Sequence, residues 1–238
     1  MVSASQVLRV LSQGEMEVKG LLPWGSNYTF LVEITHEGIR LPAVYKPARG
    51  ERPLWDFPDD TLFKREVAAY VVCEALGWGF VPPTVGRDGA EGPGSVQFYV
   101  DADPENHYFN FAEEQKQQLK HVAAYDILVN NADRKGGHVL LDRQGELWAI
   151  DHGLCFHTDP KLRTVIWDFS GQPIPPEITE AVRRFRKELT PATELHSLLG
   201  RLIAPDEIAA LRRRADRLIA AECYPQPGSG RNYPWPPL

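Results

Sequence analysis

The chain has 238 residues, 43% of them hydrophobic and 24% charged, which is enough for one large domain or two lobes with an ordinary core. Its 26 basic and 32 acidic residues give a formal charge of −6, an acidic balance that argues against a general nucleic-acid binder. Its three cysteines, Cys73, Cys155 and Cys223, form no CxxC pair and indicate neither a disulfide framework nor a cysteine-based zinc site. No apolar run approaches the ~20 residues that span a bilayer. We therefore expect a soluble, unexported protein of the reducing cytoplasm.

The first hundred residues predict a β-rich lobe interrupted by one helix. Runs with alternating apolar residues are typical of strands and lie at 18–22, 28–35, 41–46 and 95–100. The segment WGSNY predicts a turn between the first two runs, and Gly38 marks the next turn. Residues 61–76 follow Asp59 and Asp60, a capping signal, and precede Gly77, a stop signal, so they predict a helix.

The remainder of the chain predicts a mainly helical lobe. Apolar residues recur at helical spacing in 113–130, 177–189 and 205–222, and short strands are expected around 139–141 and 147–150. The last residues, YPQPGSGRNYPWPPL, contain too much proline and glycine for a helix or a strand. We therefore expect an α+β protein with an N-terminal lobe at 1–103, a C-terminal lobe at 104–224 and an extended tail at 225–238.

One polar loop carries far more functional groups than a connection needs. Within nine residues it contains Asn130, Asn131, Asp133, Arg134, Lys135 and His138. The strands that follow must pair around a turn at 143–145, which brings the loop back beside Asp151 at the end of LWAID. We expect Asp133 and Asp151 to face one cleft. One carboxylate there would accept a proton, and the other would hold a divalent cation that bridges phosphate oxygens.

A phosphate-transfer site also needs a cation near the nucleotide. Lys46 lies on the strand LPAVYKP, where an inward-facing ammonium is costly to bury without an anionic partner. Glu66, on the next predicted helix, is the partner that we expect. The chain thus carries the groups for phosphoryl transfer on three separate elements.

The order of four groups, Lys46 in VYKP, Glu66 in a helix, Asp133 in NNADR and Asp151 in IDHG, resembles a kinase core. The motif sequences are most similar to those of the phosphatidylinositol 3-/4-kinase-like family, and within it to those of the type II phosphatidylinositol 4-kinases. The resemblance covers residues 15–160 and implies a two-lobed, protein-kinase-like fold that binds ATP and Mg²⁺ or Mn²⁺. It implies that Lys46 contacts the nucleotide phosphates and that Glu66 orients it. Asp133 would be the catalytic Asp, and Asp151 the metal-binding Asp.

The resemblance also assigns the nucleotide contacts. The phosphate loop WGSNY has a single glycine, so Ser26 and Asn27 would supply donors to the phosphates. The strand SVQFYV would contact adenine through backbone groups of Gln97, Phe98, Tyr99 and Val100. Each of these assignments is an expectation that the resemblance carries.

Two further positions bear on the chemistry. Lys135 stands two residues after the catalytic Asp, where protein kinases carry a lysine that steadies the transferred phosphate. His138 stands where the family usually has a metal-binding Asn. A neutral imidazole also ligates divalent ions, but it is a softer ligand than an amide oxygen, so Mn²⁺ would be favoured over Mg²⁺.

Simpler readings compete with these roles. Taken alone, Lys46 favours the commoner fate of a strand lysine, an edge position with its head in water. Glu66 alone fits a solvated helix residue, and Asp133 with Arg134 fits a surface ion pair of little energy. Another alternative is a hydrolytic metal site made of His138, Asp151 and His152.

Three functions follow from the kinase reading. The first is an ATP-dependent phosphotransferase that acts on a hydroxyl of a lipid headgroup, a small polyol or a protein. The second is a pseudokinase that binds ATP and signals, and the third is a kinase-fold enzyme that transfers AMP. Arginine-rich helix faces at 183–187 and 212–217 are typical of solvated surfaces, with an anionic substrate or membrane headgroups as the alternative partner.

Overall fold

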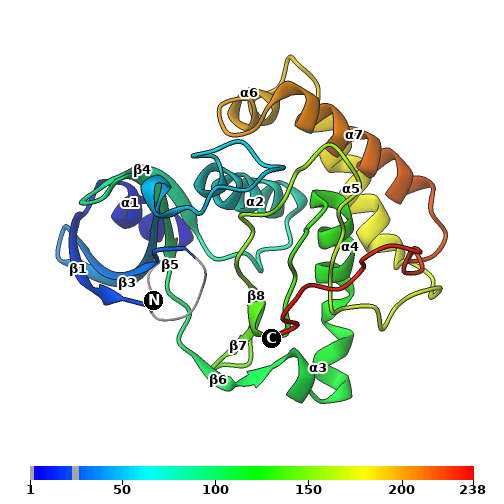
Figure 1. Ribbon diagram of the computed structural model, residues 1–238, viewed down its shortest axis with the longest axis horizontal. Coiled ribbons are helices and arrows are strands. Elements are labelled where there is room, and N and C mark those ends of the chain that lie inside the picture. Colours follow the sequence, from blue (N-terminus) through cyan, green and yellow to red (C-terminus); the bar gives the residue numbers. More distant parts are fainter. Residues whose placement is uncertain (1–2, 23–26) are drawn as a thin grey trace.

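The computed structural model describes residues 3–22 and 27–238, and its N-terminal part is built on a five-stranded antiparallel sheet (Figure 1). The strand order is β1-β2-β3-β5-β4. The strands are β1 (Glu15–Leu21), β2 (Phe30–His36), β3 (Ile39–Pro47), β4 (Thr84–Gly89) and β5 (Gly92–Phe98). Gly38, at φ 78°, makes the predicted turn between β2 and β3. The sequence predicted four of these strands and missed β4.

Helix α1 (Ala4–Gln13) covers one face of this sheet, and the sequence analysis missed it. Its start is a capping box, in which Ser3 Oγ accepts from the Gln6 amide while the Gln6 side chain accepts from the Ser3 amide. Val7, Val10 and Leu11 follow at helical spacing and are buried. They form a small core with the inward side chains of the strands, Val32, Ile34, Ala43, Tyr45 and Val96.

Helix α2 (Leu62–Leu76) lies between the sheet and the helical part of the chain (Figure 1). The predicted capping signal at Asp59 and Asp60 is wrong, because the carboxylate of Glu51 accepts the first amides of the helix, at 3.0 and 2.8 Å. The helix ends as predicted at Gly77, which has a left-handed backbone. Most of its side chains are buried, and its second half belongs to the large core of the C-terminal helices.

A second, three-stranded sheet joins the two parts of the chain. It has the order β6-β7-β8 and comprises β6 (Ala102–His107), β7 (Val139–Asp142) and β8 (Leu147–Ala149). The predicted hairpin of β7 and β8 is present, and β6 was not predicted. The lobe boundary that we expect at residue 103 falls within β6.

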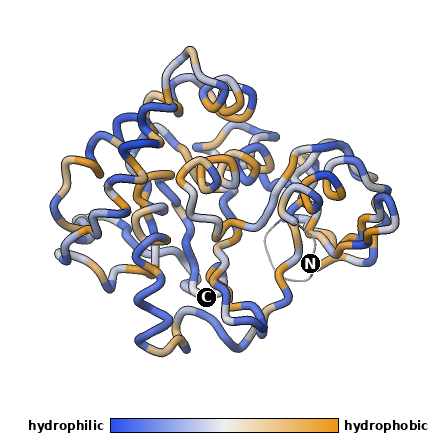
Figure 2. The backbone as a smooth tube through the Cα atoms, turned by 180° about the vertical axis from the view of Figure 1, so that it is seen from behind, coloured by the Kyte–Doolittle hydropathy of each residue, from blue (hydrophilic) through white to orange (hydrophobic). Residues whose placement is uncertain are grey.

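Helices build the remaining part and enclose the larger core. They are α3 (Glu113–Gln117), α4 (Leu119–Val129), α5 (Pro176–Glu188), α6 (Glu194–Leu199) and α7 (Pro205–Ala220). The helix predicted over 113–130 is thus two helices that meet at Gln118, and α6 was missed. Apolar segments gather where the helices face one another, whereas α3 is mainly hydrophilic (Figure 2). No helix among the described residues combines the length and apolarity needed to cross a membrane.

Only part of the arginine-rich surface is solvated as predicted. Arg183 and Arg186 lie on the outside of α5, paired with Glu180 and Asp216. Arg214 instead turns inward, and its guanidinium donates to the carbonyls of Leu128, at 2.7 Å, and His157, at 3.2 Å. For Arg214 the prediction of a solvated residue is wrong.

The junction of α1 and the sheet gives a test of the fold. A Cβ on Gly14 would lie 2.5 Å from Ile34 Cγ2 and 2.7 Å from the Val10 carbonyl oxygen, so Gly14→Ala should lower the free energy of unfolding by about 1–3 kcal/mol. Gly20→Ala is the matched control, because a Cβ there meets nothing within 4 Å. Urea unfolding of both variants measures the difference. Equal stability of the two variants would contradict this packing of α1.

Candidate active site

Lys46 lies between two carboxylates that come from distant parts of the chain. Its Nζ atom is 2.5 Å from Glu66 Oε1 and 3.0 Å from Asp151 Oδ1. The partner predicted for Lys46 is therefore present, and the readings of Lys46 and Glu66 as solvated surface residues are wrong. The Glu66 side chain is 4% exposed, whereas that of Asp151 is 46% exposed. The cluster of Lys46, Glu66 and Asp151 is therefore shielded from solvent on the side of α2 and accessible to solvent on the side of Asp151.

The backbone explains how the three groups meet. In β3 the side chains of Ala43 and Tyr45 are buried on the α1 side of the sheet, so the alternation of the strand turns Lys46 to the opposite face. The second oxygen of Glu66 accepts the amide of His152, at 2.9 Å, which fixes α2 to the residue after Asp151. Asp151 itself has φ 60°, a left-handed conformation that is costly for a non-glycine residue and is concentrated at functional sites.

The charges of this cluster depend on one another. Burial alone would lower the pKa of Lys46, but Asp151 and Glu66 outweigh burial and hold that pKa above its ordinary value. Burial raises the pKa of Glu66, and Lys46 opposes this rise. For Asp151, burial also favours the neutral form, yet Lys46 and His138 hold its pKa well below the usual range. Asp151 is therefore the carboxylate that stays ionised.

The polar loop after α4 presents Asp133. Its amide donates to Asn131 Oδ1 at 3.0 Å, and Lys135 Nζ lies 3.5 Å from Asp133 Oδ2. Burial raises the pKa of Asp133 to about 6; Lys135 opposes the rise and the nearby charge of Asp151 adds to it. The predicted approach of the two carboxylates is consistent with this mutual influence. A carboxylate with a pKa near 6 is a stronger base than an ordinary Asp.

His138 lies beside Asp151, with Nε2 3.2 Å from Asp151 Oδ2. With Nδ1 accepting the Lys135 amide at 3.4 Å, this is the separation of a hydrogen bond from His138 to Asp151, and it is also close to the about 3.0 Å expected between adjacent ligands at 2.1 Å from one octahedral ion. Burial lowers the pKa of His138 to about 4, against the opposing effect of Asp151. The neutral imidazole that ligation requires is therefore the stable form at neutral pH. The described residues contain no cluster of three or more His, Cys, Asp or Glu that would hold a metal alone, so other ligands must complete the shell.

Arg134 is not the surface residue that the simpler reading predicted. Its side chain is 0% exposed and pairs with the equally buried Asp126, with Nε 3.0 Å from Oδ2. His152 is also buried and contacts Arg134 Nη2 through Nε2, at 2.7 Å. Burial lowers the pKa of His152 well below its ordinary value, and the charge of Arg134 lowers it further. Since Nε2 of His152 faces a guanidinium nitrogen, this ring serves the buried network.

The expected nucleotide contacts are placed as follows. Ser26 lies outside the described residues. Asn27 Oδ1 accepts the amide of Arg52 at 2.9 Å, which ties the end of the expected phosphate loop to the segment after β3.

The backbone amides at the end of the expected adenine-binding strand differ in whether they already have a hydrogen-bond acceptor. Gln97 lies in β5 between two paired strands, and its side chain donates to Thr84. The amides of Phe98 and Tyr99 donate to the carbonyls of Pro83 and Pro42. Among the described residues no acceptor takes the Val100 amide, so Val100 is the position with a free donor.

One contact of the polar loop has no signal in the sequence. The amide of Gly136 donates to the carbonyl of Pro237 in the tail, at 2.8 Å. A Cβ on Gly136 would lie 2.6 Å from Phe109 Cε2, so only glycine fits between this ring and the tail. The tail has neither helix nor strand, as predicted, but it packs against the loop that carries Asp133 and ends near β7 and β8 (Figure 1).

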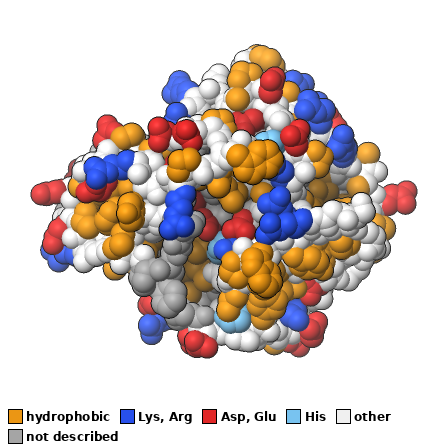
Figure 3. Space-filling model, viewed as in Figure 1, with side chains coloured by type: hydrophobic (Ala, Val, Ile, Leu, Met, Phe, Trp, Pro, Cys, Tyr) orange, Lys and Arg blue, Asp and Glu red, His pale blue; other side chains and the backbone are white. Residues whose placement is uncertain are grey.

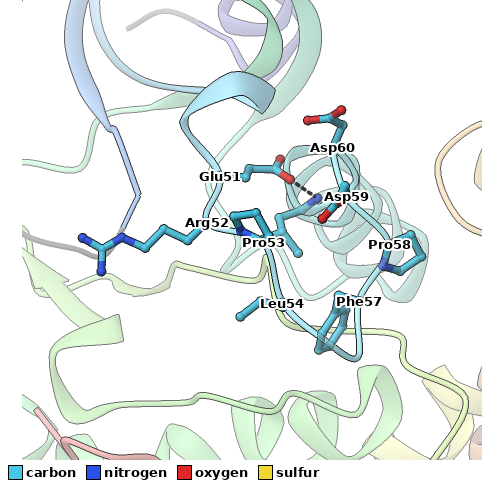
Figure 4. A pocket seen from close by; sticks show the side chains of 9 residues that line it. Glu51, Arg52, Pro53, Leu54, Phe57, Pro58, Asp59 and Asp60 are labelled. Atoms are coloured by element: carbon cyan, nitrogen blue, oxygen red, sulfur yellow. Dashed lines mark hydrogen bonds between the residues drawn. The ribbon is translucent and has the colours of Figure 1, made fainter.

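A cavity of about 230 Å³ lies beside the start of α2 (Figure 4). None of its lining residues belongs to the cluster around Lys46. Glu51 lines it and holds the first turn of α2, while Arg52 points away from it (Figure 4). On the surface, acidic side chains and a histidine lie near the centre of one face, with Lys and Arg on either side (Figure 3).

The chain matches a known protein family and relatives from two organisms. Residues 88–202 match the family described as phosphatidylinositol 3- and 4-kinase. The chain is 41% identical to protein Rv2133c of Mycobacterium tuberculosis (strain ATCC 25618 / H37Rv), over 95% of this chain and 94% of that protein. It is 30% identical to phosphatidylinositol 4-kinase gamma 4 of Oryza sativa subsp. japonica, over 48% of this chain and 24% of that protein.

Solved structures share the fold at low sequence identity. A Golgi casein kinase with Mn/ADP bound has a TM-score of 0.59 at 15% identity, over 91% of this chain and 74% of that chain. Hydra Fam20 with sugar has a TM-score of 0.59 at 12% identity, over 91% and 88% of the two chains. The Helicobacter pylori proinflammatory kinase CtkA has a TM-score of 0.54 at 11% identity, over 89% and 94%.

The fold is protein-kinase-like, and the family match over residues 88–202 supports a kinase. The chain belongs to the phosphatidylinositol 3-/4-kinase-like family, as its sequence predicted. The two-lobed α+β fold is confirmed as well. The family match covers Asp133, His138 and Asp151, and begins after Lys46 and Glu66.

The pKa of Asp133 makes stability depend on pH. A carboxyl whose pKa is raised by folding favours the folded state when protonated, so its contribution is present below the unfolded value of 3.8 and is lost as pH rises through about 6. Asp133→Asn should therefore be more stable than the unmodified chain at pH 8, and this advantage should vanish near pH 4. Urea unfolding across this range measures it.

Asp142→Asn is the control with the opposite sign. Burial would raise the pKa of Asp142, but hydrogen bonds from Trp148 and the Glu146 amide lower it overall, so its ionised carboxyl contributes stability that is present above the unfolded value of 3.8 and is lost only as pH falls below that value. Asp142→Asn should therefore be less stable than the unmodified chain by a nearly constant amount between about pH 5 and 8. An advantage of Asp133→Asn that is constant between pH 4 and 8 would contradict the raised pKa of Asp133.

Proposed function

We propose that this kinase transfers the γ-phosphoryl group of ATP to a hydroxyl acceptor. The observation that carries the proposal is the position of the Lys46 ammonium between Glu66 and Asp151, with the base Asp133 close enough to sense the charge of Asp151. A cation held by two carboxylates is fixed in place before a nucleotide arrives, which reduces the reorganisation that phosphate binding requires.

In the proposed step, the acceptor oxygen attacks the γ-phosphorus as the bond from that phosphorus to the β,γ-bridging oxygen breaks. ADP leaves with the electron pair of that bond, and the hydroxyl proton passes to Asp133. Its pKa near 6 keeps most of the carboxyl ionised at neutral pH while making it basic enough to accept the proton. Lys46 would bind the phosphates, and Lys135, 3.5 Å from Asp133, would neutralise charge on the transferred group.

A divalent metal, Mg²⁺ or Mn²⁺, would bind to Asp151 and His138. The fit rests on the ionised Asp151, the neutral His138 and the 3.2 Å between their facing atoms. A bound metal would neutralise charge on the phosphates. A kinase of the same fold has Mn/ADP bound, which supports this assignment. For the nucleotide we propose contacts to Asn27 and Ser26 in the phosphate loop and to the backbone between Gln97 and Val100.

The acceptor class remains the set predicted from the sequence: a lipid headgroup, a small polyol or a protein. We propose the cytoplasm as the location, because a kinase that uses ATP and has free thiols at Cys73, Cys155 and Cys223 suits a reducing compartment.

A nucleotide-binding pseudokinase is the second candidate. His138 in the place of the family's Asn favours it, because a metal site with an altered ligand would bind nucleotide without efficient turnover. A third candidate, transfer of AMP, would place the α-phosphate of ATP on the acceptor, whereas a kinase would place the γ-phosphate there and a pseudokinase neither.

Incubation with ATP labelled at the α- or the γ-phosphate tests these functions, with Mg²⁺ and Mn²⁺ in parallel. Vesicles of phosphatidylinositol, free myo-inositol and casein serve as acceptor probes. We expect γ-label on an acceptor, and Asp133→Asn should lower that rate by ~10²–10⁴ while nucleotide affinity is kept. Asp142→Asn is the control that should retain the rate. Transfer of α-label indicates adenylylation, and nucleotide binding without transfer indicates a pseudokinase.

The metal preference gives a separate prediction. His138→Asn replaces an imidazole nitrogen with a harder amide oxygen, so the ratio of the Mg²⁺-supported rate to the Mn²⁺-supported rate should rise. The ratio is the readout because it cancels a general loss of activity. His138→Ala removes the ligand and should weaken both metals. An unchanged ratio in His138→Asn would remove His138 from the metal site.

A further inference from the structure

We infer that Arg134 is a positioning residue that fixes the spacing between His138 and Asp151, an inference that rests on the proposed metal-dependent transfer. The proposal concerns a guanidinium whose side chain is fully buried, at 0% exposure. Its contacts reach the backbone of both segments that carry the metal-binding side chains.

One nitrogen of Arg134 makes the decisive contacts. Nη1 donates to the carbonyl of His138, at 3.2 Å, and to the carbonyl of Ile150, at 2.8 Å. The first carbonyl belongs to the proposed ligand His138, and the second belongs to the residue immediately before Asp151. The Ile150 amide donates directly to the His138 carbonyl at 3.0 Å, and the guanidinium of Arg134 adds a second connection between the two segments, whose side-chain atoms lie 3.2 Å apart.

The other nitrogens fix the guanidinium itself. Nε and Nη2 both donate to Asp126 Oδ1, at 3.2 and 3.0 Å, and Nε also donates to Oδ2, at 3.0 Å. Asp126 lies in α4, inside the larger core, and is 0% exposed. Nη2 further contacts Nε2 of His152, the residue after Asp151. Arg134 therefore connects the backbone of both ligand-bearing segments to helix α4.

The chemistry of the site requires an arginine. The rigid fork of a guanidinium donates in several directions at once, whereas a lysine ammonium is a point charge on a flexible stem. A lysine at position 134 would keep the charge pair with Asp126 but could not also hold both carbonyls. Partners behind metal ligands typically contribute 10–100-fold to metal affinity.

A purely stabilising role is the alternative to exclude. Arg214 provides the matched control, because its guanidinium also donates to two carbonyls, those of Leu128 and His157. Arg134→Lys and Arg214→Lys make the same chemical change, and both lose contacts to carbonyls. Only Arg134 touches the segments of His138 and Asp151.

Two measurements test the proposal. The first is Mn²⁺ binding in the presence of saturating ADP, followed by the loss of the free Mn²⁺ signal in electron paramagnetic resonance, with the loss caused by ADP alone subtracted. Arg134→Lys should weaken Mn²⁺ about 10–100-fold, and Arg214→Lys should leave it within about two-fold, as expected of a site that is not coupled to the metal ligands. The second is the ring ¹H–¹⁵N spectrum of His138 in the ligand-free protein, assigned with His138→Asn. This signal should shift in Arg134→Lys and remain in place in Arg214→Lys.

The outcomes separate this proposal from the proposed function. If the unmodified chain does not bind Mn²⁺ with ADP, the proposed function fails, and the His138 spectrum alone decides the role of Arg134. If Arg134→Lys matches the unmodified chain in the spectrum and in any binding observed, the positioning role is overturned. Should Arg134→Lys not unfold cooperatively, Asp126→Asn takes its place, with a smaller shift of the same signal expected and an unmoved signal again overturning the role.

Discussion

The ion cluster of Lys46, Glu66 and Asp151 is the interaction on which the arrangement of this protein depends. The ammonium of Lys46, on a strand, pairs with one carboxylate from a helix and with another from a loop, so both ion pairs exist only while all three elements stay together. Removing Lys46 would leave two neighbouring carboxylates without their shared cation. The cluster therefore couples the sheet, α2 and the Asp151 segment, and the same coupling places a cation and an ionised carboxylate in one cleft.

Helix α2 transmits this constraint to the C-terminal helices. Arg65, the neighbour of Glu66, is 2% exposed and pairs with Glu207 of α7, at 2.7 Å. It also donates to the carbonyl of Cys155, at 2.7 Å, while Glu66 accepts the amide of His152. Consecutive residues of one helix thus hold both ends of the turn after Asp151. This explains why α2 is buried on most of its surface and why it joins the larger core.

Two features of the candidate site that suit its proposed function lower the stability of the folded protein. Asp133 is held in surroundings that raise its pKa, which costs stability at neutral pH but strengthens the base. Asp151 adopts a left-handed backbone that a non-glycine residue seldom takes. The buried pair of Arg134 and Asp126 and the amide of His152 hold the surrounding backbone. The strained and titrating groups thus lie within a framework that is itself fully buried.

The sequence by itself determined six of the eight described strands, all but β4 and β6, together with the helix that carries Glu66 and the order of the charged groups. Alternation, helical spacing and motif order are local properties of the chain. It missed α1, whose signal is a short capping box, and it misjudged Arg134 and Arg214, because burial depends on residues far away in the sequence. Only the tertiary structure decided that Asp126 faces Arg134, that Glu51 begins α2 and that Pro237 meets Gly136. These contacts join segments whose separation along the chain carries no periodic signal, and they form only when the two cores have closed around them.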